Sequence, residues 1–317
     1  MATADASDLP VSVVVPAYRV SDVIERQLDA LVPQMVALAG EIVVVDDASP
    51  DGTGAVAARW ASARPDVRCT VLRCRRRLGV NASRNAGVHR SGADLIAFAD
   101  GDDVVRPGWL AALVGAAAAH TIVTGEFAWP GSTSARRVAP FYGIPLPMAL
   151  GSAMLIPRVL WRAVGGFDEE VTRGGTETEF VLQACLGHGA TVVTVPAAVV
   201  EYHLPPVGPG RRRRVREQQR GFAIIARRVR GIPGAPASTF TFRSRSRDAV
   251  GAVARMVVGG GGGRAASLDR FVVDLAGIGW IARMAWRRPP RRGYDPDRMA
   301  VDYEVLAGPS SNAVPRG

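Results

Sequence analysis

The sequence predicts an α/β protein whose central sheet is mostly parallel and is covered by helices on both faces. Short runs of apolar residues alternate along the chain with longer segments in which apolar residues recur every three or four positions. Continuous apolar runs are typical of strands that are buried on both faces, and the β-α-β-α order is typical of a parallel sheet. With 317 residues, 48% of them hydrophobic, the chain is long enough to bury one large core.

The first half of the chain contains four predicted strands separated by three predicted helices. The strands are expected at residues 11–15, 41–45, 67–72 and 94–99. The helices are expected at residues 21–38, about 51–63 and 83–90. The first helix has apolar residues at helical spacing and ends at Gly40, a common stop signal.

The second half continues the alternation with less regularity. An Ala-rich helix is predicted over residues 107–119, beginning at Pro107, a residue favoured in the first turn. Further strands are predicted at residues 121–128, 154–156 and 190–195, and a further helix at 176–187. The segment 131–147 is rich in Pro, Gly and Ser and is predicted to be an active-site loop.

Positive charge is concentrated near the C-terminal end. All 39 basic residues are Arg, against 29 acidic residues, which gives a net charge of +10. Residues 1–204 hold 17 Arg and 21 acids, a net charge of −4, whereas residues 205–317 hold 22 Arg and 8 acids, a net charge of +14. Such a basic segment predicts a polyanionic partner: a membrane surface, nucleic acid or a diphosphate.

The cysteines and the first residues bear on location. Cys69, Cys74 and Cys185 form no Cys-x-x-Cys motif, which favours reduced thiols in a reducing compartment. The first ten residues lack the apolar core of a secretory signal, and no stretch reaches the roughly 18 apolar residues of a membrane-spanning helix. The expected location is the cytoplasm, either free or peripheral on the inner face of the cell membrane.

An acidic turn follows the fourth predicted strand. The apolar run 94–99 is followed by Asp100, Gly101, Asp102 and Asp103. Carboxylates at the end of a strand are unsuited to a core, because burying an unpaired charge is costly. Asp100 and Asp102 form an Asp-x-Asp element, whose oxygens suit a hard divalent cation that arrives with a diphosphate. The alternative interpretation is a solvated acidic turn.

Two other predicted strands also end in polar residues. The first leads into Pro16-Ala17-Tyr18-Arg19 and the second into Asp46-Asp47-Ala48-Ser49. The carboxyl ends of parallel strands share one edge of the sheet, and ligands of open α/β sheets bind in the crevice there. Three polar strand ends at the spacing of successive βα units therefore predict one common site.

Taken together, these motifs resemble the family 2 glycosyltransferases, which have the Rossmann-like GT-A fold. The matching segments are residues 13–18 (VVVPAY), 43–49 (VVVDDAS), 84–87 (RNAG), 98–103 (FADGDD) and 165–169 (GGFDE). They lie within about residues 10–230, and they are specific only as a set. The resemblance implies a metal-dependent, inverting transferase that moves a sugar from a nucleotide-diphosphate donor to an acceptor hydroxyl.

The resemblance also implies roles for residues at the predicted site. The nucleotide-binding residues would be Pro16, Ala17, Tyr18, Asp46, Asp47, Arg84 and Asp100. Among them, Asp46 and the backbone of residues 16–18 would hold the base, and Asp100 would lie near the ribose. Asp102 would bind Mn²⁺ or Mg²⁺, and His203 would complete that metal site. A divalent cation suits the reaction because the leaving diphosphate gains negative charge. The alternatives are a surface charge for Arg84 and a structural histidine for His203.

Inversion at the anomeric carbon also needs a general base to deprotonate the acceptor hydroxyl. The family usually supplies it from a Glu-Asp pair at the start of a late helix, and Thr176-Glu177 occupies that place here. Glu177 is the first candidate and Glu179 the second. The alternative for both is a helix N-terminus, because the helix dipole favours an acid in the first turn and Thr176 with Glu179 matches a capping box.

The basic part of the chain begins with four consecutive arginines. Arg211, Arg212, Arg213 and Arg214 are predicted to lie in a Gly- and Pro-rich loop ahead of a helix over about 215–230. They would contact the donor diphosphate, an anionic lipid or a lipid-phosphate acceptor. The alternative is a solvated run of charges.

The predicted domain organisation places the glycosyltransferase domain between two less regular ends. The segments are a flexible N-terminus over 1–9, a GT-A domain over 10–230 with a donor half of about 10–105 and an acceptor half of about 106–230, a basic amphipathic helical extension over 231–288, and a disordered tail over 289–317. Within the extension, residues 268–286 suit a helix that lies on an anionic membrane or one that packs on the catalytic domain.

Two alternative functions are weighed against transfer. A catalytically inactive GT-A scaffold could serve as a basic membrane- or nucleic-acid-binding adaptor, and the altered Thr176-Glu177 pair motivates this alternative. Nucleic acid is disfavoured because no nucleic-acid-binding motif occurs. A nucleotidyltransferase is disfavoured because the first strand does not lead into a Gly-rich phosphate loop. The sequence leaves open the donor base (UDP, GDP or dTDP) and the acceptor (lipid-linked, a glycan or a small metabolite).

Overall fold

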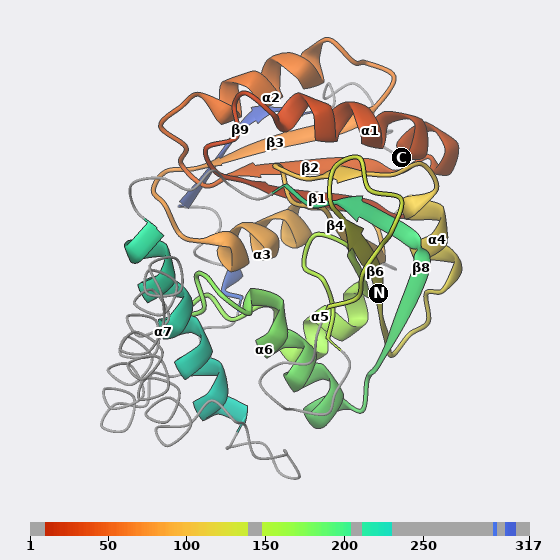
Figure 1. Ribbon diagram of the computed structural model, residues 1–317. Helices are drawn as coiled ribbons and strands as arrows, with labels where there is room; N and C mark the ends of the chain where they lie inside the picture. Colours follow the sequence, from red (N-terminus) through yellow and green to blue (C-terminus); the bar gives the residue numbers. More distant parts are fainter. Residues whose placement is uncertain (1–9, 139–147, 204–210, 230–293, 297–301, 309–317) are drawn as a thin grey trace, which may run out of the picture.

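The computed structural model describes residues 10–138, 148–203, 211–229, 294–296 and 302–308 (Figure 1). In these ranges one mixed sheet contains the strands β1 (Ser12–Ala17), β2 (Glu41–Asp46), β3 (Arg68–Cys74), β4 (Leu95–Phe98), β5 (Val104–Val105), β6 (Thr121–Ala128), β7 (Met154–Pro157), β8 (Thr191–Glu201) and β9 (Tyr303–Ala307). The helices are α1 (Ile24–Leu38), α2 (Thr53–Ser62), α3 (Val80–Arg90), α4 (Trp109–Gly115), α5 (Arg158–Val164), α6 (Thr176–Leu182) and α7 (Arg211–Val229), and a π-helical turn over Gln183–Gly187 continues α6.

The central part of the sheet is parallel, as the sequence predicts. The strand order is β5-β8-β6-β7-β4-β1-β2-β3-β9. Strand β1 lies between β2 and β4, and all the pairs in the run β4-β1-β2-β3 are parallel. The pairs β4-β7, β6-β7, β5-β8 and β3-β9 are antiparallel, so the outer parts of the sheet are mixed. Because β1, β2 and β4 are parallel neighbours, their carboxyl ends meet at one edge.

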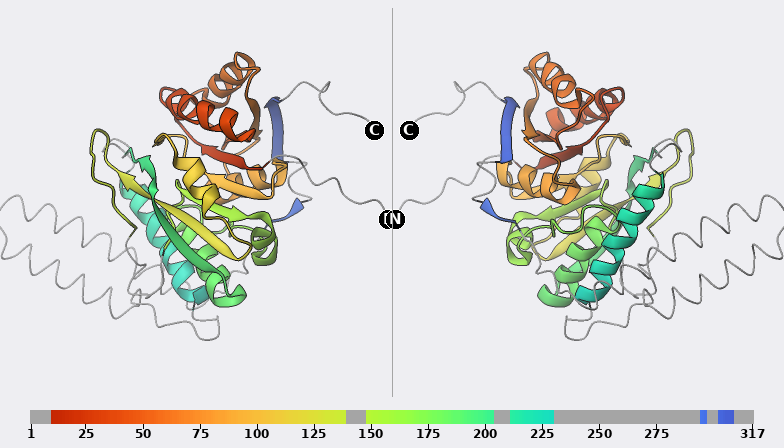
Figure 2. Two further views of the ribbon diagram at one scale, coloured as in Figure 1. Left: turned by 90° about the vertical axis from the view of Figure 1, so that its right-hand side faces the viewer. Right: turned by 90° about the vertical axis from the view of Figure 1, so that its left-hand side faces the viewer.

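Alternate residues of the buried strands point to opposite faces of the sheet. Val13 and Val15 of β1 belong to a core with residues of α1, α2 and α4, whereas Val14 packs with residues of α3, α5 and α6. All three valines are fully buried. In both views of Figure 2, the red and orange helices lie at the top and the green and teal helices below them. Two buried faces explain why these strands are continuous apolar runs.

Helix α3 approaches β1 very closely. A Cβ atom at Gly87 would lie 2.3 Å from Cγ1 of Val14, a distance that no real contact allows. The absence of a side chain at Gly87 therefore sets how near α3 lies to the sheet. The distance between α3 and the sheet matters for the site, because α3 also carries Arg84, about one turn before Gly87.

Two element ends and one helix in the second half differ from the expectation. The Ala-rich helix predicted over 107–119 ends at Gly115, because Ala118 and Ala119 are exposed and have no core to pack against. The strand predicted over 190–195 continues to Glu201. Pro196 suggested an end there, but the pairing of β6 with β8 shifts register at this point, and such irregularities accept proline. Helix α5 was not predicted at all.

Two expectations for the C-terminal part are wrong. The four arginines from Arg211 to Arg214 form the first turn of α7 instead of a loop. Residues 303–307, predicted to lie in a disordered tail, form β9 and pair with β3. The run Tyr-Glu-Val-Leu-Ala at 303–307 is short and has polar surroundings, and it becomes a strand by pairing with the outer edge of β3. Residues 1–9 and the extension over 231–288 lie outside the described residues.

The helices of the described residues were also compared with the requirements of a membrane span. None of them combines sufficient length with sufficient apolar character to cross a bilayer.

The close approach of α3 gives a test of the fold. Gly87→Ala is expected to lower the free energy of unfolding by about 1–3 kcal/mol, because the new methyl group overlaps Val14. Gly115→Ala is the matched control, since a Cβ atom there meets nothing within 4 Å, and it should change stability by less than about 0.5 kcal/mol. Urea denaturation measures both values. Equal midpoints of urea denaturation for the two variants would contradict the close packing of α3 on β1.

Candidate active site

The carboxyl ends of β1, β2 and β4 open into a cavity of about 580 Å³. Its walls come from these strand ends, from the start of α3, from the start of α6 and from the segments at 150–152 and 172–175. The predicted site residues that line it are Pro16, Ala17, Tyr18, Asp47, Arg84, Asp100, Asp102 and Glu177. The structure therefore brings together side chains that lie up to 161 positions apart, as the parallel strand order requires.

The backbone is unusual where the first two strands leave the sheet. Arg19 has a φ of 58° and Ala48 a φ of 54°, both in the left-handed region that residues with a Cβ rarely adopt. The turns hold each other, because the N–H of Arg19 donates to Oγ of Ser49 at 3.1 Å and the N–H of Asp47 donates to the carbonyl of Ala17 at 2.9 Å. Such strained positions are common at functional sites.

The acidic turn after β4 presents its carboxylates in different surroundings. The Asp100 side chain is 30% exposed, and both Asp100 and Asp102 line the cavity. Asp103 is buried and accepts the backbone N–H of His203 at 2.9 Å, so it holds the end of β8 against the turn. The turn therefore offers two carboxylates to a ligand and uses the third for structure.

Burial and mutual repulsion make these acids hard to ionise. Burial, and after it the charge of Asp100, raises the pKa of Asp102 to about 6. The same causes raise the pKa of Asp103 to about 8, with a further contribution from Asp102. His203 and Arg173 act in the opposite direction on Asp102 by stabilising its negative charge. The site therefore disfavours negative charge on these two acids, chiefly because they are buried.

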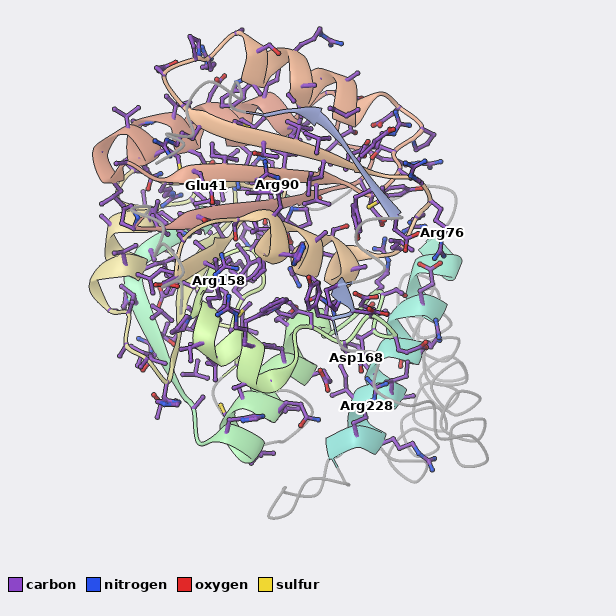
Figure 3. All side chains as sticks on the ribbon, turned by 180° about the vertical axis from the view of Figure 1, so that it is seen from behind. Glu41, Arg76, Arg90, Arg158, Asp168 and Arg228 are labelled. Atoms are coloured by element: carbon purple, nitrogen blue, oxygen red, sulfur yellow. The ribbon has the colours of Figure 1, made fainter. Side chains whose placement is uncertain are left out.

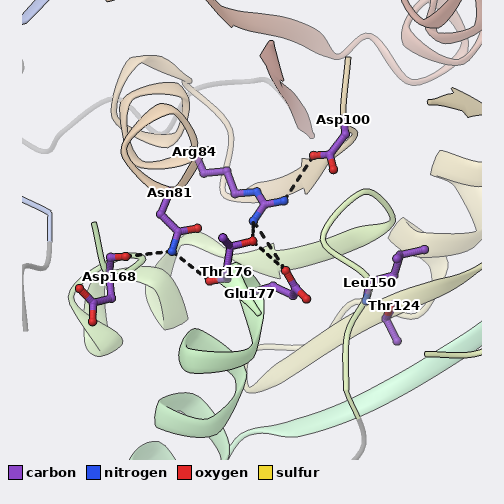
Figure 4. A network of polar contacts seen from close by, with 8 residues as sticks. All are labelled: Asn81, Arg84, Asp100, Thr124, Leu150, Asp168, Thr176 and Glu177. Atoms are coloured by element: carbon purple, nitrogen blue, oxygen red, sulfur yellow. Dashed lines mark hydrogen bonds and ion pairs between the residues drawn. The ribbon is translucent and has the colours of Figure 1, made fainter. Parts of the chain in front are cut away.

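Arg84 connects the two sides of the cavity (Figure 4). Its side chain is only 2% exposed. One terminal nitrogen, Nη2, donates to Oδ1 of Asp100 at 3.3 Å, and the other, Nη1, donates to Oγ1 of Thr176 at 3.1 Å. Nη1 also lies 4.0 Å from Oε2 of Glu177. The interpretation of Arg84 as a surface charge is therefore wrong.

Helix α3 also fixes the start of α6 through a neighbouring amide. Nδ2 of Asn81 donates to the carbonyl oxygens of Asp168 and Thr176, at 2.9 and 3.0 Å (Figure 4). Asp168 in turn forms an ion pair with Arg228 of α7 (Figure 3). The first turn of α6 is thus held by α3, and the Asp168 segment ahead of it by both α3 and α7.

The two candidate bases on α6 occupy different environments. Glu177 lines the cavity, its side chain is 21% exposed, and its Oε2 accepts the hydroxyl of Thr176 at 2.9 Å. Glu179 is 1% exposed and does not line the cavity. The N-cap residue of α6 is Gly175, so Thr176 does not occupy the N-cap position that a capping box with Glu179 requires.

The far end of the cavity is built by Tyr18, Asp47 and the segment after β3. Asp47 accepts the N–H groups of Leu78 at 2.7 Å and Gly79 at 2.9 Å, while burial raises its pKa. The guanidinium of Arg77 lies 4.1 Å from the centre of the Tyr18 ring. An aromatic ring, a cation and a carboxylate together suit recognition of a flat polar group such as a nucleobase.

Asp46 does not contribute to this wall. It is completely buried, its Oδ1 accepts the N–H of Ser49 at 3.0 Å, and its Oδ2 lies 3.7 Å from Nε of Arg73. A Cβ atom at Gly54 of α2 would come within 2.6 Å of that Oδ2, so the carboxylate is packed against the helix. Of the two neighbouring acids, Asp47 is the one whose side chain reaches the cavity.

Several lining residues were missed by the sequence analysis. They are Arg77, Gly79, Arg173, Tyr202 and Gln218. Tyr202 lies beside the acidic turn, and burial together with the negative charges of Asp103 and its neighbours raises its pKa to about 12. It also stacks edge-on with Phe127 and Trp129. Tyr202 directly precedes His203, and the prediction of a site residue at His203 was the one sequence signal that pointed to it. No sequence signal pointed to Arg77 or Gln218.

A divalent cation was predicted at Asp102 and His203. Within the described residues, no three His, Cys, Asp or Glu side chains are arranged to hold a metal ion by themselves. The carboxylates of Asp100 and Asp102 nevertheless fit such an ion, because Mg²⁺ and Mn²⁺ commonly take one or two protein carboxylates and complete their shell with phosphate and water. His203 is close enough to lower the pKa of Asp102, but it does not line the cavity.

The side chains of Arg211 to Arg214 lie outside the described residues, so their predicted contacts stay predictions. The later part of α7 does reach the site. Gln218 lines the cavity, and Nε of Arg173 lies 3.3 Å from Oε2 of Glu217. A Cβ atom at Gly221 would lie 2.1 Å from the carbonyl of Arg173, so α7 packs directly on the segment at 172–175.

Comparison with known proteins agrees with the family resemblance. Residues 12–142 match the model of the glycosyl transferase family 2. The succinoglycan biosynthesis protein ExoO of Rhizobium meliloti is 39% identical over 97 residues, which are 31% of this chain and 26% of that protein. The glycosyltransferase AglE of Haloferax volcanii is 28% identical over 183 residues, 53% of this chain and 60% of that protein. The chain thus spans less than two thirds of these relatives.

Solved structures agree with the fold. The mannosyltransferase PcManGT from Pyrobaculum calidifontis, in complex with GDP-Man and Mn²⁺, superposes with a TM-score of 0.64 at 19% identity, over 90% of each chain. Residues 1–349 of TarS from S. aureus, in complex with UDP-GlcNAc, give a TM-score of 0.53 at 18% identity, over 71% of this chain and 68% of that one. At these identities the likeness shows the fold alone, and the predicted GT-A fold is confirmed.

The raised pKa values predict how stability depends on pH when no cation is bound. Asp102 and Asp103 titrate near 6 and 8 in the folded protein and near 3.8 when unfolded. The folded state therefore binds more protons between about pH 4 and 8, and this contribution to stability is lost as the pH rises through that window. Asp102→Asn is expected to be more stable than wild type by about 1–3 kcal/mol at pH 7.5 and equal to it near pH 4. Urea denaturation with EDTA measures the difference, and a constant difference across the window would contradict the repulsion.

Proposed function

We propose that this family 2 glycosyltransferase moves a sugar from a nucleotide-diphosphate donor to an acceptor hydroxyl, with inversion at the anomeric carbon and with a divalent cation on the diphosphate. The observation that carries the proposal is the cavity itself. It places two carboxylates suited to a cation, Asp100 and Asp102, across Arg84 from Glu177, a carboxylate suited to act as a base.

The donor nucleotide would bind at the end of the cavity near β1 and β2. Tyr18, with Arg77 stacked on it, supplies a face for the base, and Asp47 supplies an acceptor for its N–H groups. The burial of Asp46 against α2 favours Asp47 for this contact. Of the similar structures, PcManGT is in complex with GDP-Man and TarS with UDP-GlcNAc, which supports a nucleotide-sugar for this chain and leaves its base open.

Asp100 and Asp102 would hold Mn²⁺ or Mg²⁺. When bound, the ion supplies positive charge that stabilises the diphosphate as it leaves. Arg84 holds Asp100 in place through Nη2, and its buried charge adds to the positive field beside the leaving group. The complex of PcManGT with Mn²⁺ supports a divalent ion, without deciding between the two metals.

Glu177 would act as the general base. The acceptor oxygen forms a bond to the anomeric carbon, the bond from that carbon to the diphosphate breaks, and the hydroxyl proton passes to Oε2 or Oε1 of Glu177. The hydroxyl of Thr176 donates to Oε2 and orients the carboxylate. Glu177 is favoured over Glu179 because only Glu177 lines the cavity.

The acceptor would enter on the side of Tyr202, Phe127 and Trp129. Trp129 is 38% exposed, and an aromatic group there offers an apolar face to a sugar ring or a lipid. The net charge of +14 over residues 205–317 supports contact with an anionic inner membrane surface and a lipid-linked acceptor. A glycan and a small metabolite are the alternative acceptors.

An inactive scaffold that serves as an adaptor is the second candidate, motivated by Thr176 in place of the usual acid. A donor screen separates the two. We expect one of UDP, GDP or dTDP, as the sugar nucleotide with Mn²⁺, to raise the melting temperature, since a ligand of the folded state alone stabilises it. No shift with any nucleotide would contradict transfer and favour the adaptor.

The same screen tests the cation site. In Asp102→Asn the shift that depends on Mn²⁺ should disappear, because one of the two cavity carboxylates is lost, and transfer should fall at least about 100-fold. The fold should survive, as shown by circular dichroism. A full metal-dependent shift in this variant would place the cation elsewhere.

The base is tested by exchanging carboxylate for amide at both candidates. Glu177→Gln should lower kcat by about 100-fold or more, because general-base catalysis contributes about 10²–10⁴, while the donor KM changes little. Glu179→Gln should leave kcat within a few-fold, since Glu179 lies outside the cavity. Steady-state kinetics at saturating metal decide between the two residues. A larger loss of kcat in Glu179→Gln than in Glu177→Gln would make Glu179 the base.

A further inference from the structure

The segment that follows β3 forms the wall of the cavity at its nucleotide end. Residues 75–79 connect β3 to α3, and Arg77 and Gly79 line the cavity. The backbone N–H groups of Leu78 and Gly79 donate to the two oxygens of Asp47. The position of this loop therefore determines where the cation of Arg77 and the carboxylate of Asp47 face a ligand.

The C-terminal segment contacts the loop where it begins. Strand β9 runs antiparallel to β3, with Tyr303 opposite Cys74 and Glu304 opposite Arg73. One residue further, the N–H of Arg75 donates to the carbonyl of Asp302 at 2.8 Å. The side chains of Arg76 and Asp302 form an ion pair at 3.6 Å, and Arg76 lies near one end of β9 (Figure 3).

The same segment contacts the loop where it ends. The phenol of Tyr303 donates to the carbonyl of Ala82 in the first turn of α3, at 3.1 Å. Burial raises the pKa of that phenol, so it keeps its proton and stays a donor. The Tyr303 ring also packs with Leu78 on a small core formed by β2, β3 and α3. Tyr303 thus joins the end of β3, the loop and the start of α3.

We propose that β9 positions the 75–79 loop for the donor nucleotide, and that Tyr303 is a positioning residue for donor binding although it lies outside the cavity. The inference rests on the proposed function, because it concerns the nucleotide end of the same site. Its physical basis is that a short loop is fixed by its two flanking elements, and β9 holds both of them. Without β9, the loop would be held chiefly by its bonds to Asp47.

The test is Tyr303→Phe in the full chain, which removes the bond to Ala82 and keeps the ring. The Kd for the nucleotide that binds wild type should rise about 3- to 10-fold, the value of one hydrogen bond to a positioned group. Hydrogen exchange of the Leu78 and Gly79 amides should accelerate without ligand. The donor KM should rise with the Kd, whereas kcat and the acceptor KM should stay unchanged. Val305→Thr is the matched control, because Val305 lies on the same strand and is 59% exposed.

A second variant addresses the strand as a whole. Glu304→Pro removes a backbone donor and disturbs the pairing with Arg73, so its effects on the Kd and on amide exchange should exceed those of Tyr303→Phe. If both variants fold and bind the nucleotide as wild type does, or if they lose stability while the amides of the loop remain protected, the inference is overturned. If wild type itself binds no nucleotide, the proposed function fails first, and the amide exchange of the loop still reports whether β9 positions it.

Discussion

The burial of a single charged group, the guanidinium of Arg84, governs the geometry of the site. The Arg84 side chain is 2% exposed, so water does not hydrate its charge. The charge must therefore be paired with groups of the protein. Its partners come from opposite sides of the cavity: Asp100 after β4, and Thr176 with Glu177 at the start of α6. The backbone at Gly151 also leaves room for Arg84, because a Cβ atom at Gly151 would lie 2.5 Å from Nη2 of Arg84. Arg84 thus ties together acids from opposite sides of the cavity.

Arg84 neutralises only part of the charge that the fold gathers here. Asp102 and Asp103 keep pKa values near 6 and 8 although Arg173 and His203 lie close enough to favour ionisation of Asp102. Ionising these buried acids near neutral pH costs stability, and a cation beside them would offset that cost. At the same time, an anionic diphosphate would be repelled by these carboxylates alone. A divalent ion held by Asp100 and Asp102 would supply positive charge against both effects, which is why these carboxylates suit the proposed chemistry.

The sequence predicts the part of this arrangement that depends on local pattern and on the order of strands. Apolar runs identify β1, β2, β3 and β4, and their parallel order brings Asp47, Asp100 and Asp102 to one edge. Pattern does not tell which of two adjacent acids faces the ligand, because Asp46 is the last residue of β2 and Asp47 directly follows it. Nor does it identify Tyr202 or Arg77, whose positions follow from the packing of distant segments.

The C-terminal strand illustrates the same limit most clearly. Residues 303–307 are a largely apolar run of only 5 residues within a polar tail, and their pairing partner precedes them by more than 200 positions. The driving force for β9 lies in β3, whose outer backbone groups need partners, and in the small core that the Tyr303 ring covers. Since the loop after β3 forms a wall of the cavity, satisfying that edge also fixes a functional surface. Here the backbone bonds of β9 complete the sheet, and on our proposal its Tyr303 hydroxyl, bound to Ala82 of α3, constrains the site as well.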